Sequence, residues 1–295
     1  MIIGIDLGNF GVNTSENDFF YSKISEGSSF TGENSIIYEG KEFQIGEGEF
    51  STDLDKSKKE STLPLLFTAL ARSSNEKFFQ VVLGLPIQQY KANKESFKNY
   101  IEENRGKTLI YKGIRREIII SDVIIAPEGA AAYYNLSVEQ KNMIGKKPLI
   151  ICDIGGRTTD ICLFENGKIT RVWTIPTGML NIYQDIISYI NTTYTEEFKL
   201  EDGEVILKEG LFLRGKQQDI RFIKPILRKH FNSIYKDLQL NFNTSKGYVL
   251  LTGGGSITLV KAFKNRLENL IISDEPLFDN AKGFKKLGVS LWCAK

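Results

Sequence analysis

One stretch of the sequence, LIICDIGGRTTDICLF from Leu149 to Phe164, constrains the fold more than any other. Two apolar segments flank a turn that carries two glycines, an arginine, two threonines and two aspartates. A tight hairpin needs only a residue pair such as Asn-Gly, so these polar side chains exceed what a turn requires. The pattern indicates two buried strands that carry a polar site at their shared end.

The beginning of the chain repeats this pattern. IGIDLGNFGVN, around Asp6, and IICDIGGRTTD, around Asp153, are both apolar strands that end in Asp-x-Gly before a small polar loop and a second strand. Glycines let the backbone approach an anion, and consecutive N–H groups can point into a phosphate. The carboxylates suit a hydrated magnesium ion, which prefers carboxylate and water ligands. The polar residues of the two turns are therefore better explained by a bound nucleotide than by the needs of a hairpin alone.

A third glycine-rich turn, LLTGGGS from Leu250 to Ser256, leads from an apolar strand into a helix. Such a turn lets a phosphate or a flat ligand lie against the backbone. The spacing of the three turns, near residues 6, 153 and 253, strengthens signals that are weak singly. No Gly-x-x-x-x-Gly-Lys-Ser/Thr motif is present, which disfavours a P-loop NTPase.

The order of elements also repeats. Each half begins with a strand and antiparallel hairpins and continues with strands and helices, which predicts two similar α/β halves in tandem. Glu39-Gly40 and Asn166-Gly167 are predicted hairpin turns. Residues 52–62 are expected to form an exposed polar loop, and Pro225 is a candidate kink in a helix that starts near Gln217.

Composition excludes several classes of protein. The net charge is +2 on 38 basic and 36 acidic residues, without the concentrated basic excess of a nucleic-acid binder. The basic runs DKSKKES and LRKHF are interpreted as solvated faces. There are three cysteines and no Cys-x-x-Cys pair, and His230 is the only histidine, expected at the surface or at a helix cap. A disulfide, a thiol or imidazole metal site and a Ser-His-Asp triad are therefore disfavoured.

The location follows from what the sequence lacks. No charged segment followed by a long apolar run opens the chain, and no stretch approaches the ~18 apolar residues of a membrane span. We expect a cytoplasmic protein with no signal peptide. The length of 295 residues favours two domains over one.

As a set, these motifs resemble those of the actin/Hsp70/sugar-kinase ATPase superfamily. IGIDLGNFG, IICDIGGRTTDI and LLTGGGS look like its phosphate-1, phosphate-2 and adenosine motifs, and IIAPEGAAAYYN looks like its first connecting motif. FDNAKGFKKLG looks like the second, in which a glycine lets the closing helix pack at the hinge. Within the superfamily, the chain most resembles the bacterial actin-like ParM/StbA proteins that segregate plasmids.

The resemblance implies an actin-like ATPase fold of two tandem RNase H-like α/β domains with a nucleotide cleft between them. Domain I is expected over residues 1–146, with a small subdomain at about 19–62, and is completed by a C-terminal helix over 276–295. Domain II is expected over 147–275, with a small subdomain at about 193–216.

The resemblance also implies the site residues. Glu128, Asp153 and Asp160 would be catalytic, with Glu128 orienting the hydrolytic water, and Asp6 and Asp153 would lie near the magnesium ion. The residues expected to bind ATP or GTP are Asp6, Gly8, Asn9, Phe10, Gly11, Gly155, Gly156, Arg157, Thr158, Glu209, Lys216, Gly253, Gly254 and Gly255. Asn13 stands where many relatives carry a lysine, so Arg157 or another cation would have to neutralise the phosphates.

The expected function is magnesium-dependent ATP or GTP hydrolysis coupled to polymerisation into filaments that segregate plasmid DNA. A DNA-binding adaptor protein would link the filament to the plasmid centromere, without direct contact to nucleic acid or membrane. Phe43, Phe50 and Phe212 are candidate head-to-tail contacts, although each is a better candidate for local core. The alternative is a sugar or other small-molecule kinase of the same superfamily. A non-enzymatic membrane–filament anchor is disfavoured because no amphipathic terminal helix is recognised.

Overall fold

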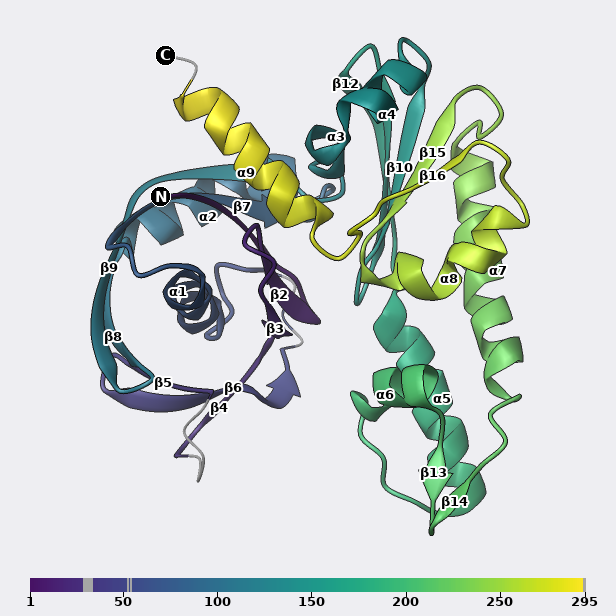
Figure 1. Ribbon diagram of the computed structural model, residues 1–295, viewed down its shortest axis with the longest axis horizontal. Helices are drawn as coiled ribbons and strands as arrows, with labels where there is room; N and C mark the ends of the chain where they lie inside the picture. The colour runs from purple at the N-terminus through teal and green to yellow at the C-terminus, as the bar shows by residue number, and fades with distance from the viewer. Residues whose placement is uncertain (29–33, 52, 54, 294–295) are drawn as a thin grey trace.

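The computed structural model describes residues 1–28, 34–51, 53 and 55–293 of the chain. In this part of the chain, the N-terminal half builds a nine-stranded sheet and the C-terminal half a five-stranded sheet. Figure 1 shows the two sheets as separate lobes, with helix α9 (Asp279–Trp292) returning to the first lobe. The prediction of two tandem α/β halves is confirmed.

The centres of the two sheets have one topology. The strand orders β3-β2-β1-β7-β9 and β12-β11-β10-β15-β16 each join three antiparallel strands to two parallel ones. The strands of the first set are β1 (Ile2–Leu7), β2 (Gly11–Thr14), β3 (Phe19–Tyr21), β7 (Phe78–Leu85) and β9 (Ile114–Pro127). Those of the second are β10 (Leu149–Ile154), β11 (Thr159–Glu165), β12 (Lys168–Ile175), β15 (Tyr248–Thr252) and β16 (Leu270–Ile272). The predicted division at residues 146 and 147 stays a prediction.

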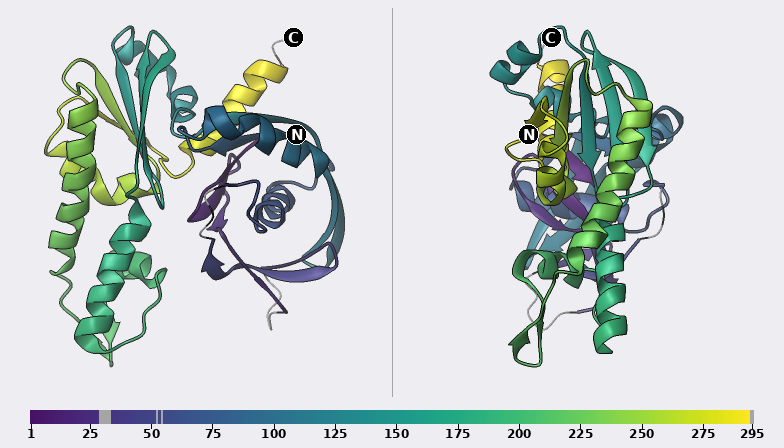
Figure 2. Two further views of the ribbon diagram at one scale, coloured as in Figure 1. Left: turned by 180° about the vertical axis from the view of Figure 1, so that it is seen from behind. Right: turned by 90° about the vertical axis from the view of Figure 1, so that its right-hand side faces the viewer.

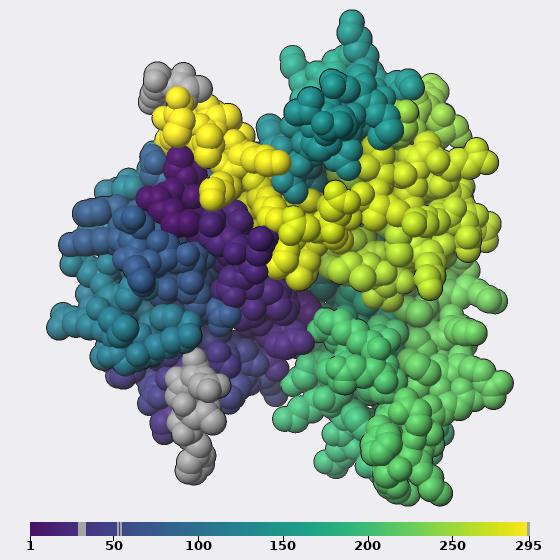
Figure 3. Space-filling view, in the orientation of Figure 1, coloured from purple at the N-terminus to yellow at the C-terminus, as the bar shows by residue number. Residues whose placement is uncertain are grey.

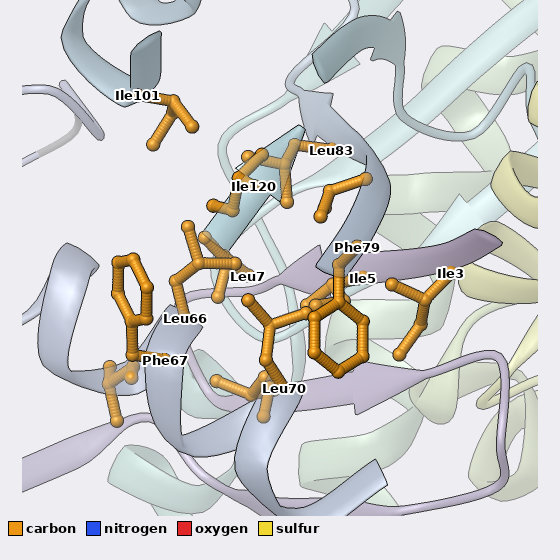
Figure 4. Close-up of a cluster of buried hydrophobic side chains, with 14 of the residues drawn as sticks. Ile3, Ile5, Leu7, Leu66, Phe67, Leu70, Phe79, Leu83, Ile101 and Ile120 are labelled. Atoms are coloured by element: carbon orange, nitrogen blue, oxygen red, sulfur yellow. The ribbon is translucent and has the colours of Figure 1, made fainter. Parts of the chain in front are cut away.

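The first sheet continues beyond β9 and curls around a helix. The added strands are β8 (Gly106–Tyr111), β5 (Ser35–Tyr38), β6 (Lys41–Phe50) and β4 (Lys23–Glu26). Figure 1 shows α1 (Thr62–Ser73) inside this curved sheet. Figure 4 shows Leu66, Phe67 and Leu70 of α1 among the strand residues Ile5 and Phe79. The helix is apolar on nearly all sides because the sheet surrounds it.

Helices cover both faces of the second sheet. Side chains alternate along β10, so that Ile150 and Cys152 face a core shared with α5 (Met179–Tyr194) and α7 (Ile223–Asn241). Ile151 faces the opposite core, beneath α3 (Ala132–Asn135) and α4 (Val138–Ile144). Figure 2 shows α5 and α7 extending the second lobe beyond its sheet. The remaining elements are α2 (Tyr90–Glu103), α6 (Asp202–Glu209), α8 (Gly254–Lys264), β13 (Phe212–Leu213) and β14 (Lys216–Gln217).

Helix α9 joins the two lobes. It packs on β1 and β7, with Phe284 fully buried. A Cβ atom on Gly283 would lie 2.0 Å from the carbonyl oxygen of Ala131, next to α3. The predicted role of a glycine in this segment, close packing of the closing helix, therefore agrees with the geometry. Among the described residues, no helix combines the length and apolar character needed to cross a bilayer.

Local predictions have mixed outcomes. Glu39-Gly40 and Asn166-Gly167 form hairpin turns with positive φ angles, as predicted. The kink at Pro225 is wrong, because α7 begins at Ile223 and the proline falls in its first turn, where no backbone donor is needed. Helix α4 was not predicted, although the Ser137 and Gln140 capping box that starts it is legible in the sequence.

Two predictions about charged or polar residues are wrong. The loop before α1 is not an exposed lysine-rich face, because Lys56 and Lys59 are only 3% and 7% exposed. Thr52 and Leu54 of the same predicted loop lie outside the described residues. His230 is buried in α7 rather than exposed or at a cap, and its Nε2 lies 2.8 Å from Asp185 Oδ2.

Candidate functional site

A cleft of about 270 Å³ lies where β1 and β10 end, and both lobes line it. Figure 3 shows the two lobes side by side, with α9 crossing between them. Among the predicted site residues, those that line the cleft are Asp6, Gly8, Asn9, Phe10, Gly11, Glu128, Asp153, Gly155, Gly156, Arg157, Thr158, Asp160, Gly253, Gly254 and Gly255. The topology brings them together because equivalent strands of the two repeated sheets end at the cleft.

Asp6 and Asp153 come from different lobes and share one partner. The Nδ2 atom of Asn280, at the start of α9, donates to Asp153 Oδ2 at 2.9 Å and to Asp6 Oδ2 at 3.2 Å. The second oxygen of Asp6, Oδ1, is buried without a hydrogen-bond partner. Since a buried carboxylate oxygen normally has a partner, this orphaned atom indicates a missing ligand in the cleft.

The electrostatics of this pair suit the binding of a cation. Burial, followed by the charge of Glu128, raises the pKa of Asp6 to about 7. Burial and the neighbouring Asp6 raise the pKa of Asp153 well above its usual range. No group of three or more His, Cys, Asp or Glu residues that could hold a metal occurs in the described chain. The pair therefore fits magnesium, which takes one or two carboxylates and completes its shell with water and phosphate oxygens.

Asp160 lies directly opposite Asp153 in the antiparallel pairing of β10 and β11. Its carboxylate accepts hydrogen bonds from the hydroxyls of Thr158, at 3.2 Å, and Thr174. Burial raises the pKa of Asp160 to about 6, and the charge of Glu128 adds to the rise. Within the opening motif, Thr158 thus fixes the position of Asp160, and Thr174 of the neighbouring strand supports it.

Glu128 follows β9 and points toward the same carboxylates. It forms an ion pair with Lys56, whose ammonium also donates to the carbonyl oxygen of Gly84 at 3.1 Å. The next residue, Gly129, donates its backbone N–H to Asn280 Oδ1 at 3.0 Å. Asn280 therefore connects the segment of Glu128 to both aspartates.

The third glycine turn closes the cleft from the second lobe. Gly253 has a φ angle of +80°, and a Cβ atom there would lie 2.2 Å from Asp153 Oδ1. Helix α8 starts at the next residue, and Gly254 and Gly255 of its first turn line the cleft. A helix N-terminus favours bound phosphate.

Glu209 and Lys216 do not line the cleft. Glu209 is exposed at the end of α6, and Lys216 is exposed in the short hairpin of β13 and β14. The α6 residues that do line it are Glu204, Leu207 and Lys208, which share one face at helical spacing. Glu209 lies about 100° further around the helix than Lys208, so it faces away from the cleft, and its predicted role in nucleotide binding stays a prediction.

Apolar side chains also line the cleft. Tyr183, Ile257 and Leu277 come from α5, α8 and the segment before α9. The ring of Phe10 lies 5.7 Å from that of Tyr183, so the first phosphate-type loop contacts the second lobe. Apolar side chains of this kind suit a purine base, since ligand pockets are lined mainly by hydrophobic and aromatic residues.

Sequence reasoning also missed Asn280, which lines the cleft, and Lys56 and Lys59, which lie behind its wall. Asn280 lies within the second connecting motif, so its position in the sequence could have identified it as a candidate site residue. The lysines lie in a polar run that looks solvated. Only the folded chain shows that Lys59 Nζ lies 2.5 Å from Asn9 Oδ1, beside the first loop.

The two halves of the chain match two family models. Residues 4–130 match the N-terminal domain of actin-like proteins. Residues 151–265 match the C-terminal domain of MreB-like archaeal actin homologues. Together with two repeated α/β lobes around one acidic cleft, these matches define an actin-like fold. The chain belongs to the actin-like proteins, as the resemblance of its motifs predicted.

Solved structures support the fold over the whole chain. A 15-stranded ParM filament from Clostridium botulinum has a TM-score of 0.83 at 21% identity, covering 97% of this chain and 98% of that one. Ta0583, an archaeal actin homologue solved in complex with ADP, has a TM-score of 0.83 at 19% identity and the same coverage. At these identities the likeness shows the fold alone.

Curated relatives match only locally. The cell division protein FtsA of Bacillus subtilis is 39% identical over 98 residues, which are 31% of this chain. FtsA of Pseudomonas aeruginosa is 34% identical over 93 residues. The chain covers about a fifth of the length of these relatives (20% and 21%).

Proposed function

We propose that the chain is a nucleotide-hydrolysing actin-like protein that polymerises into filaments and so moves plasmid DNA in the cytoplasm. The observation that carries the proposal is the meeting of Asp6 and Asp153, one from each lobe, beside three glycine turns in one cleft. The choice between ATP and GTP stays open, because the residues that line the apolar end do not distinguish the two bases.

The substrate would lie with its phosphates between the loops at 8–11 and 155–158 and its base toward Ile257 and Leu277. Asp6 and Asp153 would hold magnesium, which neutralises phosphate charge when bound. The N–H groups at the start of α8 would donate to phosphate oxygens. Because all these groups come from both lobes, a bound nucleotide would fix the angle between the lobes.

Hydrolysis would depend on Glu128 and Asp160. Both carboxylates line the cleft near the two aspartates, and both are held in place, Glu128 by Lys56 and Asp160 by its two threonines. A carboxylate fixed beside the terminal phosphate can orient the attacking water and accept its proton. Glu128 is our candidate for this role.

Filament formation is supported by the neighbours, which include a ParM filament. Of the three candidate contact residues, Phe212 is 63% exposed, whereas Phe43 and Phe50 pack against the two cores. Head-to-tail contacts between unlike surfaces give open helical polymers, so Phe212 is the candidate that remains. The near-neutral charge agrees with indirect contact to DNA through an adaptor protein.

Light scattering tests this proposal. With magnesium and ATP, or magnesium and GTP, scattering should rise above a threshold protein concentration, and phosphate release should accompany it. Electron microscopy of the same samples should show filaments. A flat signal with both nucleotides at high protein concentration would contradict polymerisation.

The alternative is a small-molecule kinase with the same cleft, in which a carboxylate such as Asp153 would activate an acceptor hydroxyl. Such an enzyme would transfer phosphate to the acceptor and would release little inorganic phosphate without it. The filament reading is preferred because the solved structures of high TM-score include a filament.

A further inference from the structure

The cleft is acidic for a site that would hold a triphosphate. Its lining contains five acids (Asp6, Glu128, Asp153, Asp160 and Glu204) and two bases (Arg157 and Lys208). The first loop, from Gly8 to Gly11, contributes no basic residue. A triphosphate carries more charge than one magnesium ion neutralises, so a further cation at the phosphate end is needed.

Lys59 lies at that end, just behind the lining. Its ammonium is 2.5 Å from the side-chain oxygen of Asn9, and Asn9 belongs to the cleft wall. The segment that carries Lys59 is fixed: Thr62 donates its hydroxyl to the carbonyl oxygen of Lys56 at 2.6 Å, and Lys56 reaches across to Gly84 and Glu128. Lys59 is thus held against the first loop by folded structure.

The two lysines differ in their partners. The charge of Lys56 is compensated by Glu128, which is close enough for an ion pair. Lys59 has no carboxylate within 4 Å among the described residues, although it is only 7% exposed. Burial, followed by the charges of Lys56 and Arg157, lowers the pKa of Lys59 to about 8. A buried ammonium beside other cations is unfavourable unless an anion arrives.

We propose that Lys59 binds the terminal phosphate of the nucleoside triphosphate in this cleft. The inference rests on the proposed nucleotide-binding function. In the structure, the amide oxygen of Asn9 holds the ammonium beside the first loop. When a terminal phosphate lies against that loop, its oxygens replace the amide oxygen as the partner of Lys59. The lysine would then favour triphosphate over diphosphate.

The test compares the affinities of Lys59→Met, Lys59→Arg and Lys58→Met for magnesium ATP and ADP, with GTP and GDP in parallel. Lys58 is the matched control, because it precedes Lys59 and its side chain is 77% exposed. Lys59→Met should bind triphosphate about tenfold more weakly or worse, with less than about a twofold change for diphosphate. Lys59→Arg should keep most of the preference, and Lys58→Met should resemble the unmodified protein.

Equal losses for triphosphate and diphosphate in Lys59→Met, or no loss for either, would overturn the proposal. Thermal melting of each variant separates a folding defect from a binding defect. If Lys59→Met does not fold, Lys59→Arg still tests the proposal. Loss of the triphosphate preference in a folded arginine variant would also contradict the proposed role of Lys59. If the unmodified protein binds none of the four nucleotides, the proposed function itself is wrong, which is a distinct result.

Discussion

Asn280 donates one amide group to two carboxylates from different lobes, Asp153 at 2.9 Å and Asp6 at 3.2 Å. Its oxygen accepts the N–H of Gly129, beside Glu128. The side chain of Asn280, at the start of α9, therefore holds together the two aspartates proposed to bind magnesium and the segment that carries Glu128. Any change in the separation of the lobes has to be accommodated at this residue.

Replacing Asn280 with alanine should destabilise the nucleotide-free protein by about 1–3 kcal/mol, because both carboxylates lose a buried donor. Denaturant unfolding measures this change. Asn142→Ala, at an exposed position of α4, is the control and should stay within about 0.5 kcal/mol of the unmodified protein. A variant of Asn280 as stable as the control would show that the bridge does not contribute to stability.

Replacing Glu128 with glutamine should slow phosphate release by about 10²–10⁴-fold while nucleotide affinity changes only a few-fold. Glutamine keeps an oxygen that can accept a hydrogen bond from Lys56 but removes the proton acceptor. Glu139→Gln, on exposed α4, should hydrolyse normally. Normal turnover in the Glu128 variant would remove this residue from its proposed role.

Gly253→Ala and Gly215→Ala form a matched pair. Both glycines have φ near +80°, but a Cβ on Gly253 would lie 2.2 Å from Asp153 Oδ1, whereas a Cβ on Gly215 meets no atom within 4 Å. Both variants should show the strain of an alanine at positive φ, about 1–3 kcal/mol. Only Gly253→Ala should also abolish nucleotide binding in a binding titration, and binding by both variants would argue against a cleft at this turn.

The free energy of unfolding should depend on pH through the titration of Asp6. Its pKa is about 7 in the folded chain against an ordinary value of 3.8. Between these values the folded state retains a proton that the unfolded state has released, so the free energy of unfolding should fall as pH rises from about 4 to about 7. Asp160 and Asp153, whose pKa values are also raised, act in the same direction.

Asp6→Asn removes one titrating group and should flatten this fall by an amount on the order of a few kcal/mol. Denaturant unfolding at several pH values, without nucleotide or magnesium, measures the two curves. Superimposable pH profiles for the variant and the unmodified protein would mean that Asp6 does not titrate in this range.

The fold and most of the cleft could be predicted because their signals are local. Asp-x-Gly after an apolar strand, and glycines before a helix, indicate backbone turns whose chemistry is fixed by neighbouring residues. Strand and hairpin order then placed Asp6 and Asp153 in equivalent positions of two similar halves. Repetition within one chain is what converted weak motifs into a specific prediction.

The remaining features depend on tertiary contacts. Lys56 and Lys59 lie in a run that reads as solvated, but they are buried against residues distant in the sequence. Lys56 contacts Gly84 and Glu128, and Lys59 contacts Asn9. Glu209 was the predicted residue, whereas its neighbour Lys208 lines the cleft. A shift of one residue along a helix changes the face on which the side chain lies. His230 is buried beside Asp185, which lies on another helix. A contact between two helices cannot be predicted from the local sequence pattern.

The central claim is that the two lobes bind one magnesium nucleotide between their aspartate hairpins. A crystal structure of the protein with magnesium and a non-hydrolysable triphosphate analogue tests it most directly. We predict electron density for phosphates between the loops at 8–11 and 155–158, with a metal ion facing Asp6 and Asp153. A structure from crystals grown at saturating analogue in which that space holds only solvent, or in which the analogue lies elsewhere, would contradict the account.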